Sequence, residues 1–123
     1  MMYAKAKLFG DEEIAKEILT ESKPNKIKAL GRKVKNFDDN VWHQNREKIM
    51  YDAVFAKFSQ NEDLKKILLE TNDKTIAEAS PSDTIWGIGL GLNDSRIHNT
   101  NSWRGLNLLG KALMKARNDF LVK

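Results

Sequence analysis

Apolar residues recur every three or four positions along residues 41–58, and this spacing predicts one long helix. The acidic and amide side chains of residues 38–40 supply an N-cap for that helix. The same spacing returns in four further stretches, which are residues 3–19, 27–34, 64–68 and 106–120. We expect a break near Gly10 in the first of them. The pattern predicts a mainly α domain of about five helices.

Two stretches depart from helical spacing. Residues 75–79 are too short for an independent helix, and we expect a strand there, so the fold class is α+β only through minor short strands. Residues 80–103 contain a proline, three glycines and two of the three Trp residues. Long loops of this kind inside a compact domain are usually functional. At the end of this loop, Asn101 and Ser102 are expected to cap the last helix.

Length and composition narrow the class of protein. A chain of 123 residues with 41% hydrophobic residues predicts a single compact domain, residues 1–123, with its own core. The absence of cysteine excludes disulfide scaffolds, Cys-based zinc sites, thiol nucleophiles and iron–sulfur clusters. The N-terminal residues are too charged for a signal peptide, and no apolar run approaches the ~18 residues of a membrane span. We therefore expect a soluble, cytoplasmic protein that does not enter the membrane.

The positive charge of the chain is concentrated in one stretch. Six Lys and Arg residues lie between Lys23 and Lys35 with no acidic residue among them, whereas the net charge of the whole chain is +4. Such a stretch either holds phosphate groups or forms a solvated helix surface, and both interpretations stay open. No aromatic residues are interleaved with the basic ones, which argues against a nucleic-acid-binding module.

The segment from Glu78 to Gly91 is the most informative part of the loop. It places two carboxylates, Glu78 and Asp83, five residues apart beside Trp86 and three alternate glycines. Alternate glycines expose backbone N–H groups and allow a ligand to approach closely, and a Trp side chain can cover a flat ring. The spacing is neither the dinucleotide fingerprint nor a P-loop. The segment predicts either a binding site or a tight turn around a core Trp.

The sequence lacks the residue patterns of two common kinds of active site. His43 and His98 are 55 positions apart and lack a helical Glu or His partner, so no metal site is expected. A Gly-x-Ser-x-Gly nucleophile elbow is absent as well, which argues against a serine triad.

Taken in order, several blocks along the chain resemble the NADAR family. They are Lys5-Ala6 with Phe9-Gly10-Asp11, Lys28-Ala29-Leu30-Gly31-Arg32, Trp42, Lys57-Phe58-Ser59-Gln60-Asn61, Leu68-Leu69-Glu70-Thr71, Glu78 to Gly89, and Trp103 to Met114. These blocks cover nearly the whole chain in the order of the family, so the resemblance does not depend on a single motif.

The resemblance implies a function. The family includes YbiA-like N-glycosidases that act on phosphorylated ribosylamino intermediates of riboflavin biosynthesis, and members that remove ADP-ribose from guanine. For this chain it implies hydrolysis of an N-glycosidic bond in a ribosyl-phosphate or ADP-ribosyl substrate, which includes ADP-ribosylated nucleic acid, without metal or cofactor. A non-catalytic domain that binds nucleotides or ADP-ribose is the alternative.

Roles for individual residues follow from the matching blocks. The catalytic candidates are Lys5, Glu78 and Asp83, because carboxylates stabilise an oxocarbenium ion and activate water, and a lysine acts electrostatically or forms a Schiff base with an opened sugar. Arg32 is the candidate phosphate contact, since its planar guanidinium matches phosphate oxygens. The remaining substrate-binding candidates are Trp42, Trp86, Gly87, Gly89 and Asn107, the last as the group that orients a hydroxyl.

One departure from the family pattern bears on activity. Family members carry an upstream segment with a Ser-Asn-Phe-like block and a Glu shortly before the position that matches Met1. The 123-residue chain starts after that Glu. We therefore expect this chain to bind ligand but to hydrolyse it weakly or not at all.

Overall fold

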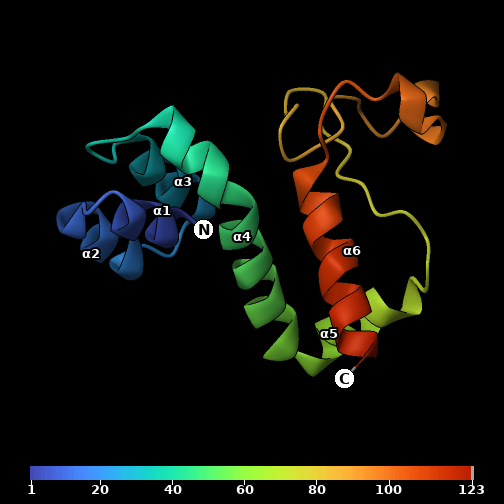
Figure 1. The fold of residues 1–123 in the computed structure, drawn as a ribbon, viewed down its shortest axis with the longest axis horizontal. Helices are drawn as coiled ribbons and strands as arrows, with labels where there is room; N and C mark the ends of the chain where they lie inside the picture. The colour runs from blue at the N-terminus through green and yellow to red at the C-terminus, as the bar shows by residue number, and fades with distance from the viewer. Residues whose placement is uncertain (123) are drawn as a thin grey trace. The chain divides into compact units, whose positions relative to one another are not determined.

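The computed structural model describes residues 1–122, and these residues fold into helices joined by irregular segments (Figure 1). The helices are α1 (Met2–Leu8), α2 (Glu12–Thr20), α3 (Pro24–Arg32), α4 (Asp39–Ser59), α5 (Glu62–Glu70), the short 3₁₀ turns η1 (Ser95–His98) and η2 (Thr100–Ser102), and α6 (Leu108–Leu121). The contacts within the chain group into two units, Met1–Ile49 and Met50–Lys123, with the boundary inside α4. The assignment of one domain stays a prediction.

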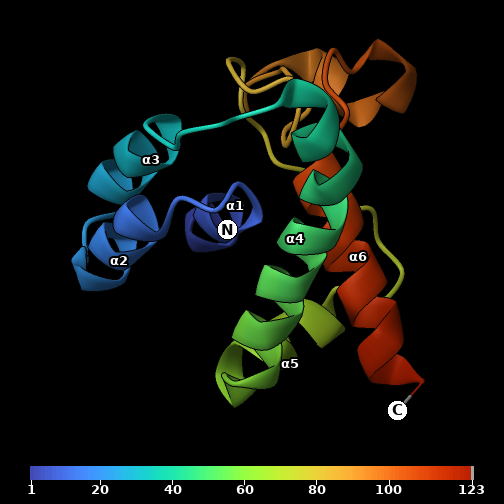
Figure 2. The ribbon, with the colours of Figure 1, turned by 60° about the vertical axis from the view of Figure 1, so that its left-hand side comes forward.

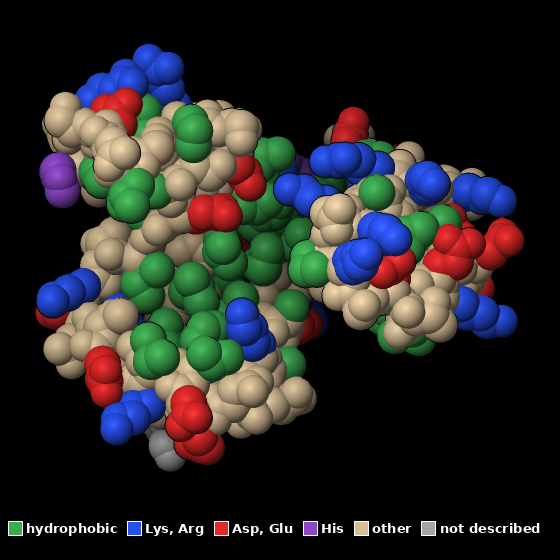
Figure 3. All heavy atoms as spheres, turned by 180° about the vertical axis from the view of Figure 1, so that it is seen from behind, with side chains coloured by type: hydrophobic (Ala, Val, Ile, Leu, Met, Phe, Trp, Pro, Cys, Tyr) green, Lys and Arg blue, Asp and Glu red, His purple; other side chains and the backbone are tan. Residues whose placement is uncertain are grey.

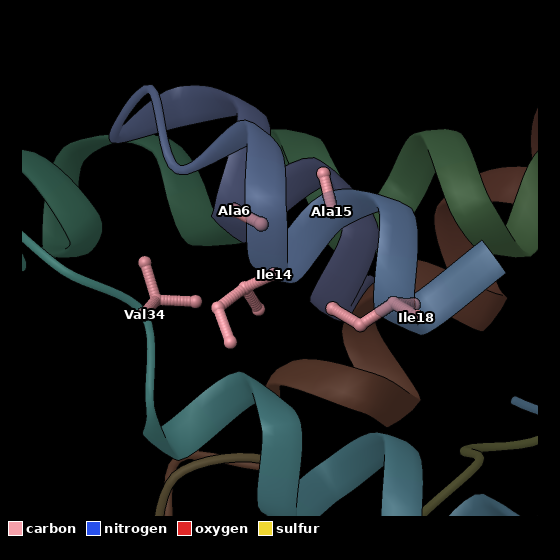
Figure 4. Packing of buried hydrophobic residues seen from close by; sticks show 5 residues of the cluster. All are labelled: Ala6, Ile14, Ala15, Ile18 and Val34. Atoms are coloured by element: carbon pink, nitrogen blue, oxygen red, sulfur yellow. The ribbon is translucent and has the colours of Figure 1, made fainter. Parts of the chain in front are cut away.

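The first unit gathers α1, α2 and α3 (Figure 2). Gly10 adopts a φ of 72°, which ends α1 and turns the chain into α2. Asp11 caps α2, because its Oδ1 accepts a 3.1 Å hydrogen bond from the backbone N–H of Ile14. Figure 4 shows the small core that these helices and the segment after α3 enclose, made of Ala6, Ile14, Ala15, Ile18 and Val34.

The second unit is built around α6. Val54 of α4 packs against Ala112 and Ala116 of α6, and the half-buried rings of Phe58 and Phe120 extend this core. α5 lies beside α6 (Figures 1 and 2). From the end of α5, the yellow trace of Figure 1 runs along α6, in the opposite direction, to the loops at its N-terminal end. This segment carries Glu78.

Most of the helix predictions are confirmed. The periodic stretch 41–58 lies within α4, the helix predicted around residues 64–68 is α5, and the break near Gly10 is present. The structure contains six α-helices within residues 1–122 where about five were expected, because that break divides the first stretch into α1 and α2. No helix in this part of the chain combines the length and apolarity needed to span a membrane.

Two predictions were wrong. Residues 75–79 form no strand, and residues 1–122 contain none at all, so the expected minor strands are absent. The last helix starts at Leu108 and not after Ser102, because Asn107 has a φ of 53° and helical backbone begins only beyond it. Asn101 and Ser102 lie in the short turn η2.

Candidate functional site

The glycine-rich loop of the second unit pairs with the chain that leads into α6. The backbone N–H of Arg104 donates to the carbonyl oxygen of Ile88 at 2.8 Å, and that of Leu106 donates to Thr84 at 2.8 Å. Further along, the carbonyl oxygens of Ile85 and Trp86 accept hydrogen bonds from the first N–H groups of α6. Because the first N–H groups of a helix have no partner within it, this loop caps α6.

Gly87 and Gly89 are buried in this pairing. A Cβ on Gly87 would lie 2.9 Å from the carbonyl oxygen of Asp83 and 3.3 Å from Oε2 of Glu78. Gly89 has a φ of 73°, and a Cβ there would lie 2.9 Å from Cβ of Arg104. Both glycines are therefore required by contacts within the chain, and their predicted contact with substrate stays a prediction.

Asn107 connects the start of α6 to the segment that carries Glu78. Its side chain is 2% exposed. Nδ2 donates to the carbonyl oxygen of Ile76 at 2.9 Å, and Oδ1 accepts from the backbone N–H of Glu78 at 3.1 Å. The side chain of Asn107 thus holds the backbone on both sides of residue 77. Its predicted contact with a hydroxyl group of the substrate stays a prediction.

Glu78 carries an unusual oxygen. Its Oε2 is buried and has no hydrogen-bond partner within the described residues. Leaving a buried carboxylate oxygen unpaired costs free energy, and such atoms are typical of sites whose partner is a substrate, an ion or water. Of the two acidic candidates, Glu78 is therefore the one whose environment points to a ligand.

Asp83 has a local role as well. Its Oδ1 accepts hydrogen bonds from the backbone N–H groups of Ile85 at 3.0 Å and Trp86 at 2.8 Å. This closed turn sets the position of Trp86, whose side chain is half-buried. Asp83 is itself half-buried, and its second oxygen accepts no hydrogen bond from the described residues.

Lys5 lies in the first unit, within an aromatic environment. Its Nζ donates a 2.8 Å hydrogen bond to the carbonyl oxygen of Gly31, and it lies 4.7 Å from the ring centroid of Phe37 and 5.6 Å from that of Trp42. Burial of the ammonium and, to a smaller extent, the charge of Arg32 lower the pKa of Lys5. A lower pKa increases the fraction of neutral amine, which is the nucleophilic form.

The basic stretch lies on the surface of the first unit. Arg32 ends α3, and all six Lys and Arg side chains between Lys23 and Lys35 are exposed. Figure 3 shows Lys and Arg side chains mixed with Asp and Glu on this unit. An exposed Arg32 can bind a phosphate group, and exposure is equally expected of a solvated helix surface. The exposure therefore does not decide between these two interpretations of the stretch.

Each unit thus brings together part of the predicted set. In the first unit, Lys5 lies near the ring of Trp42 and is affected by the charge of Arg32. In the second unit, Gly87 lies beside both Asp83 and Glu78. The backbone of Glu78 is in turn hydrogen-bonded to Asn107. Sequence reasoning missed Phe37 as the ring beside Lys5. Nothing in the spacing signals this pair, because the two residues are 32 positions apart and meet only after folding.

A comparison with protein families decides the affiliation of the chain. The model of the NADAR domain matches residues 1–121. The chain belongs to the NADAR family. Because this match includes α1 to α6 and the loop between residues 70 and 108, the NADAR domain contains every candidate residue named above.

Relatives of this NADAR chain include named enzymes. It is 52% identical over 119 residues to N-glycosidase R617 of Acanthamoeba polyphaga mimivirus, and 46% identical over 124 residues to protein irg-1 of Caenorhabditis elegans. It is also 33% identical over 113 residues to the chloroplastic riboflavin biosynthesis protein PYRR of Zea mays.

The lengths of these relatives differ from that of the chain. The matches cover 97%, 99% and 89% of this chain, in the same order. They cover 70% of the viral protein, 58% of the nematode protein and 16% of the maize protein. All three relatives are therefore longer than the stretch that they share with this NADAR chain.

Proposed function

We propose that this chain is an N-glycosidase that hydrolyses the bond between ribose and a base-like group in a ribosyl-phosphate or ADP-ribosyl substrate. The observation that carries the proposal is the 52% identity, across 97% of the chain, to a protein named N-glycosidase. The relative named for riboflavin biosynthesis favours a phosphorylated intermediate of that pathway as substrate. ADP-ribosylated guanine, free or in nucleic acid, is the other substrate class, and a cytoplasmic location belongs to the same proposal.

The reaction breaks the bond between the anomeric carbon of ribose and a nitrogen of the base. Water supplies a hydroxyl group to that carbon and a proton to the departing nitrogen. Positive charge develops on the ribose as the bond lengthens, so a nearby carboxylate lowers the barrier and can take a proton from the water. We assign this role to Glu78, because its Oε2 is buried without a partner in the described residues.

Asp83 is the second acidic candidate. One of its oxygens holds the turn at Trp86, and the other is available to the developing charge. We assign Trp86 to the face of the base or ribose, with the backbone at Gly87 and Gly89 beside it. Asn107 contributes by fixing the backbone of Glu78.

The first unit supplies three further candidates. The lowered pKa of Lys5 favours its neutral amine, which suits attack on the carbonyl carbon of an opened sugar. Trp42 and Arg32 lie next to this amine through ring contact and charge, and we assign the guanidinium of Arg32 to the substrate phosphate.

Release of the free base, followed by chromatography, tests the proposal. In a chain extended upstream to include the Glu of the family pattern, Glu78→Gln and Asp83→Asn are expected to lower turnover by roughly 10²–10⁴-fold with little change in binding, because each removes a charge used in the transition state. Asp83→Asn retains the Oδ1 acceptor of its turn. Asp94→Asn is the matched control, because Asp94 also caps a turn through Oδ1 in the same long loop, and it should leave turnover unchanged.

A second arm concerns the Glu that the resemblance to the family implies upstream of the matched stretch. We expect base release to be weak in the 123-residue chain and strong in a chain extended upstream to include that Glu. Binding of ADP-ribose without base release by either chain would contradict the proposal in favour of the non-catalytic alternative.

A further inference from the structure

Phe37 is 43% exposed and lies in the link between α3 and α4 (Figure 2). Carboxylates hold the backbone on both sides of it. Before Phe37, the backbone N–H of Lys35 donates a 2.8 Å hydrogen bond to Oδ2 of Asp11, which is buried. After Phe37, Oδ1 of Asp38 accepts hydrogen bonds from the N–H groups of residues 40 and 41, at 2.9 and 3.2 Å, and caps α4. The backbone around this exposed ring is therefore anchored.

The ring of Phe37 also has neighbours of its own. Its centroid lies 5.2 Å from that of Phe9, and the two ring planes are inclined by 58°. Inclined rings attract each other because the positive edge of one meets the negative face of the other. Nζ of Lys5 lies 4.7 Å from the centroid of Phe37, within the range of a cation–π contact. The exposed ring is thus held next to the amine of the candidate site.

A purely structural role explains only part of this arrangement. Counted from the cap at Asp38, Phe37 and Trp42 are the N′ and N4 residues of α4. Side chains at these two positions pack together in a hydrophobic staple, which fixes how the chain enters the helix. A staple requires an apolar side chain at N′, but not an aromatic one. The staple does not explain why the Lys5 amine lies near both rings, at 4.7 and 5.6 Å from their centroids.

The charged groups near the ring match two parts of the substrate class proposed above. Burial is the main reason that the pKa of Lys5 is lowered, and the charge of nearby Arg32 is the second. In the proposed function, Arg32 binds the phosphate and Lys5 meets the sugar. The base attached to that sugar is flat, and aromatic side chains bind such rings by stacking. Phe37 is an exposed ring beside the amine that meets the sugar.

We propose that Phe37 stacks on the base-like group of the substrate and thereby favours ligands that carry a flat ring on the ribose. The inference rests on the proposed function, which supplies the roles of Arg32 and Lys5. It adds a residue that determines specificity. Arg32 meets the phosphate that both substrate classes contain, whereas Phe37 distinguishes a base-bearing ribosyl phosphate from a sugar phosphate without a base. Because the ring is already anchored, stacking on it costs little further conformational freedom.

Two ligands test this inference on the 123-residue chain. One is guanosine 5′-monophosphate, and the other is methyl riboside 5-phosphate, in which a methoxy group replaces the base and keeps the sugar closed. Calorimetry measures the affinity for each ligand. Phe37→Leu keeps an apolar residue for the staple but removes the ring, so it should weaken binding of the nucleotide by about tenfold and leave binding of the methyl riboside unchanged.

Two further variants and a spectroscopic signal complete the experiment. Phe37→Tyr retains the ring and should bind the nucleotide like the original chain. Tyr3→Leu is the matched control, because it removes another exposed ring of the same unit, and it should change neither affinity. In NMR spectra, the ring current of Phe37 should shift the H8 signal of bound guanine upfield, and Phe37→Leu should abolish this shift. Melting temperatures show whether each variant is folded.

The possible results separate this inference from the proposed function. The inference would be overturned if Phe37→Leu binds the nucleotide as tightly as the original chain, or if it weakens both ligands equally, which indicates a structural role. Absence of nucleotide binding by the original chain, or its loss in Phe37→Tyr, would also overturn it. Nucleotide binding that depends on the ring, without base release by the extended chain, would contradict the proposed hydrolysis and support the role of Phe37.

Discussion

The side-chain Nδ2 of Asn107 donates a 2.9 Å hydrogen bond to the carbonyl oxygen of Ile76, 31 positions earlier in the chain. Together with the hydrogen bond from the N–H of Glu78 to Oδ1, it joins the N-terminal end of α6 to the segment that carries the acidic candidate. Asn107 also has a left-handed backbone, with a φ of 53°. Its side chain and its backbone conformation can therefore be tested separately.

Asn107→Gly keeps the left-handed backbone and removes both side-chain hydrogen bonds. We expect it to lower the free energy of unfolding by about 2 kcal/mol, because the backbone groups at Ile76 and Glu78 lose their partners. Asn107→Ala should cost about 1 kcal/mol more, since Ala disfavours positive φ. Urea denaturation measures both values. Equal stability of the Ala variant and the original protein would show that this linkage contributes nothing.

Gly110 is expected to be intolerant of substitution even though it lies in a helix. A Cβ there would lie 2.2 Å from the carbonyl oxygen of Ile76 and 2.4 Å from Nδ2 of Asn107. Gly110→Ala should therefore lower the free energy of unfolding by about 2 kcal/mol, whereas the same change in an open helix stabilises by about 1 kcal/mol. Gly91→Ala is the control, because its Cβ would meet Pro81 at 3.9 Å, an ordinary contact. Thermal melting of the two variants compares them, and similar losses in both would contradict the prediction.

Lys5 is expected to titrate below the ordinary pKa of lysine. Burial is the main cause and the charge of Arg32 the second, so Arg32→Gln should raise the pKa of Lys5 without restoring it fully. NMR titration of ¹³C-methylated lysines measures this, with Lys5→Arg used to assign the signal. Lys7 serves as an internal reference, because its hydrogen bond to Glu12 raises its pKa. A Lys5 signal that titrates with or above that of Lys7 would contradict the prediction.

Asp11 should make the stability of the first unit depend on acid pH. The backbone N–H of Lys35, at 2.8 Å from Oδ2, and that of Ile14 lower the pKa of Asp11 below 3.8. Since the folded pKa is below the unfolded one, the stabilisation is fully present above the unfolded value and is lost as the pH falls through the folded value. Asp11→Asn removes the charge and the Oδ2 acceptor. Melting temperatures should differ between the two proteins at pH 6 and converge as the pH falls through the lowered pKa of Asp11, and a constant difference would refute this linkage.

The positions of the helices were largely predictable, because a helix depends on residues three and four positions apart. The stretch with helical spacing, residues 41–58, lies within α4, and Gly10 marks the break before α2. Resemblance of the blocks also indicated the family that the match over residues 1–121 establishes. The candidate residues Glu78 and Asp83 came from the glycine-rich segment 78–91, and Lys5 came from this resemblance; the roles of all three await the assays above.

Hydrogen bonds and backbone conformation decided the two features that the sequence pattern predicted wrongly. Residues 75–79 are too short for an independent helix and were expected to form a strand. A strand requires a neighbouring strand, whereas the hydrogen bonds of these residues go to Asn107, Ser80 and Ile88. The start of α6 depended on the left-handed backbone of Asn107, which a side-chain pattern does not reveal.

The sequence thus contained the helices, the family and the chemical types of the candidate residues, since these depend on local spacing and on residue identity. Only the tertiary structure decided which atoms are occupied and which are open. It placed Lys5 against Gly31, 26 positions away, and beside Phe37, and it left Oε2 of Glu78 buried without a partner in the described residues. Such contacts join residues far apart in the chain, and their distances follow from how helices and loops pack rather than from the order of neighbouring residues.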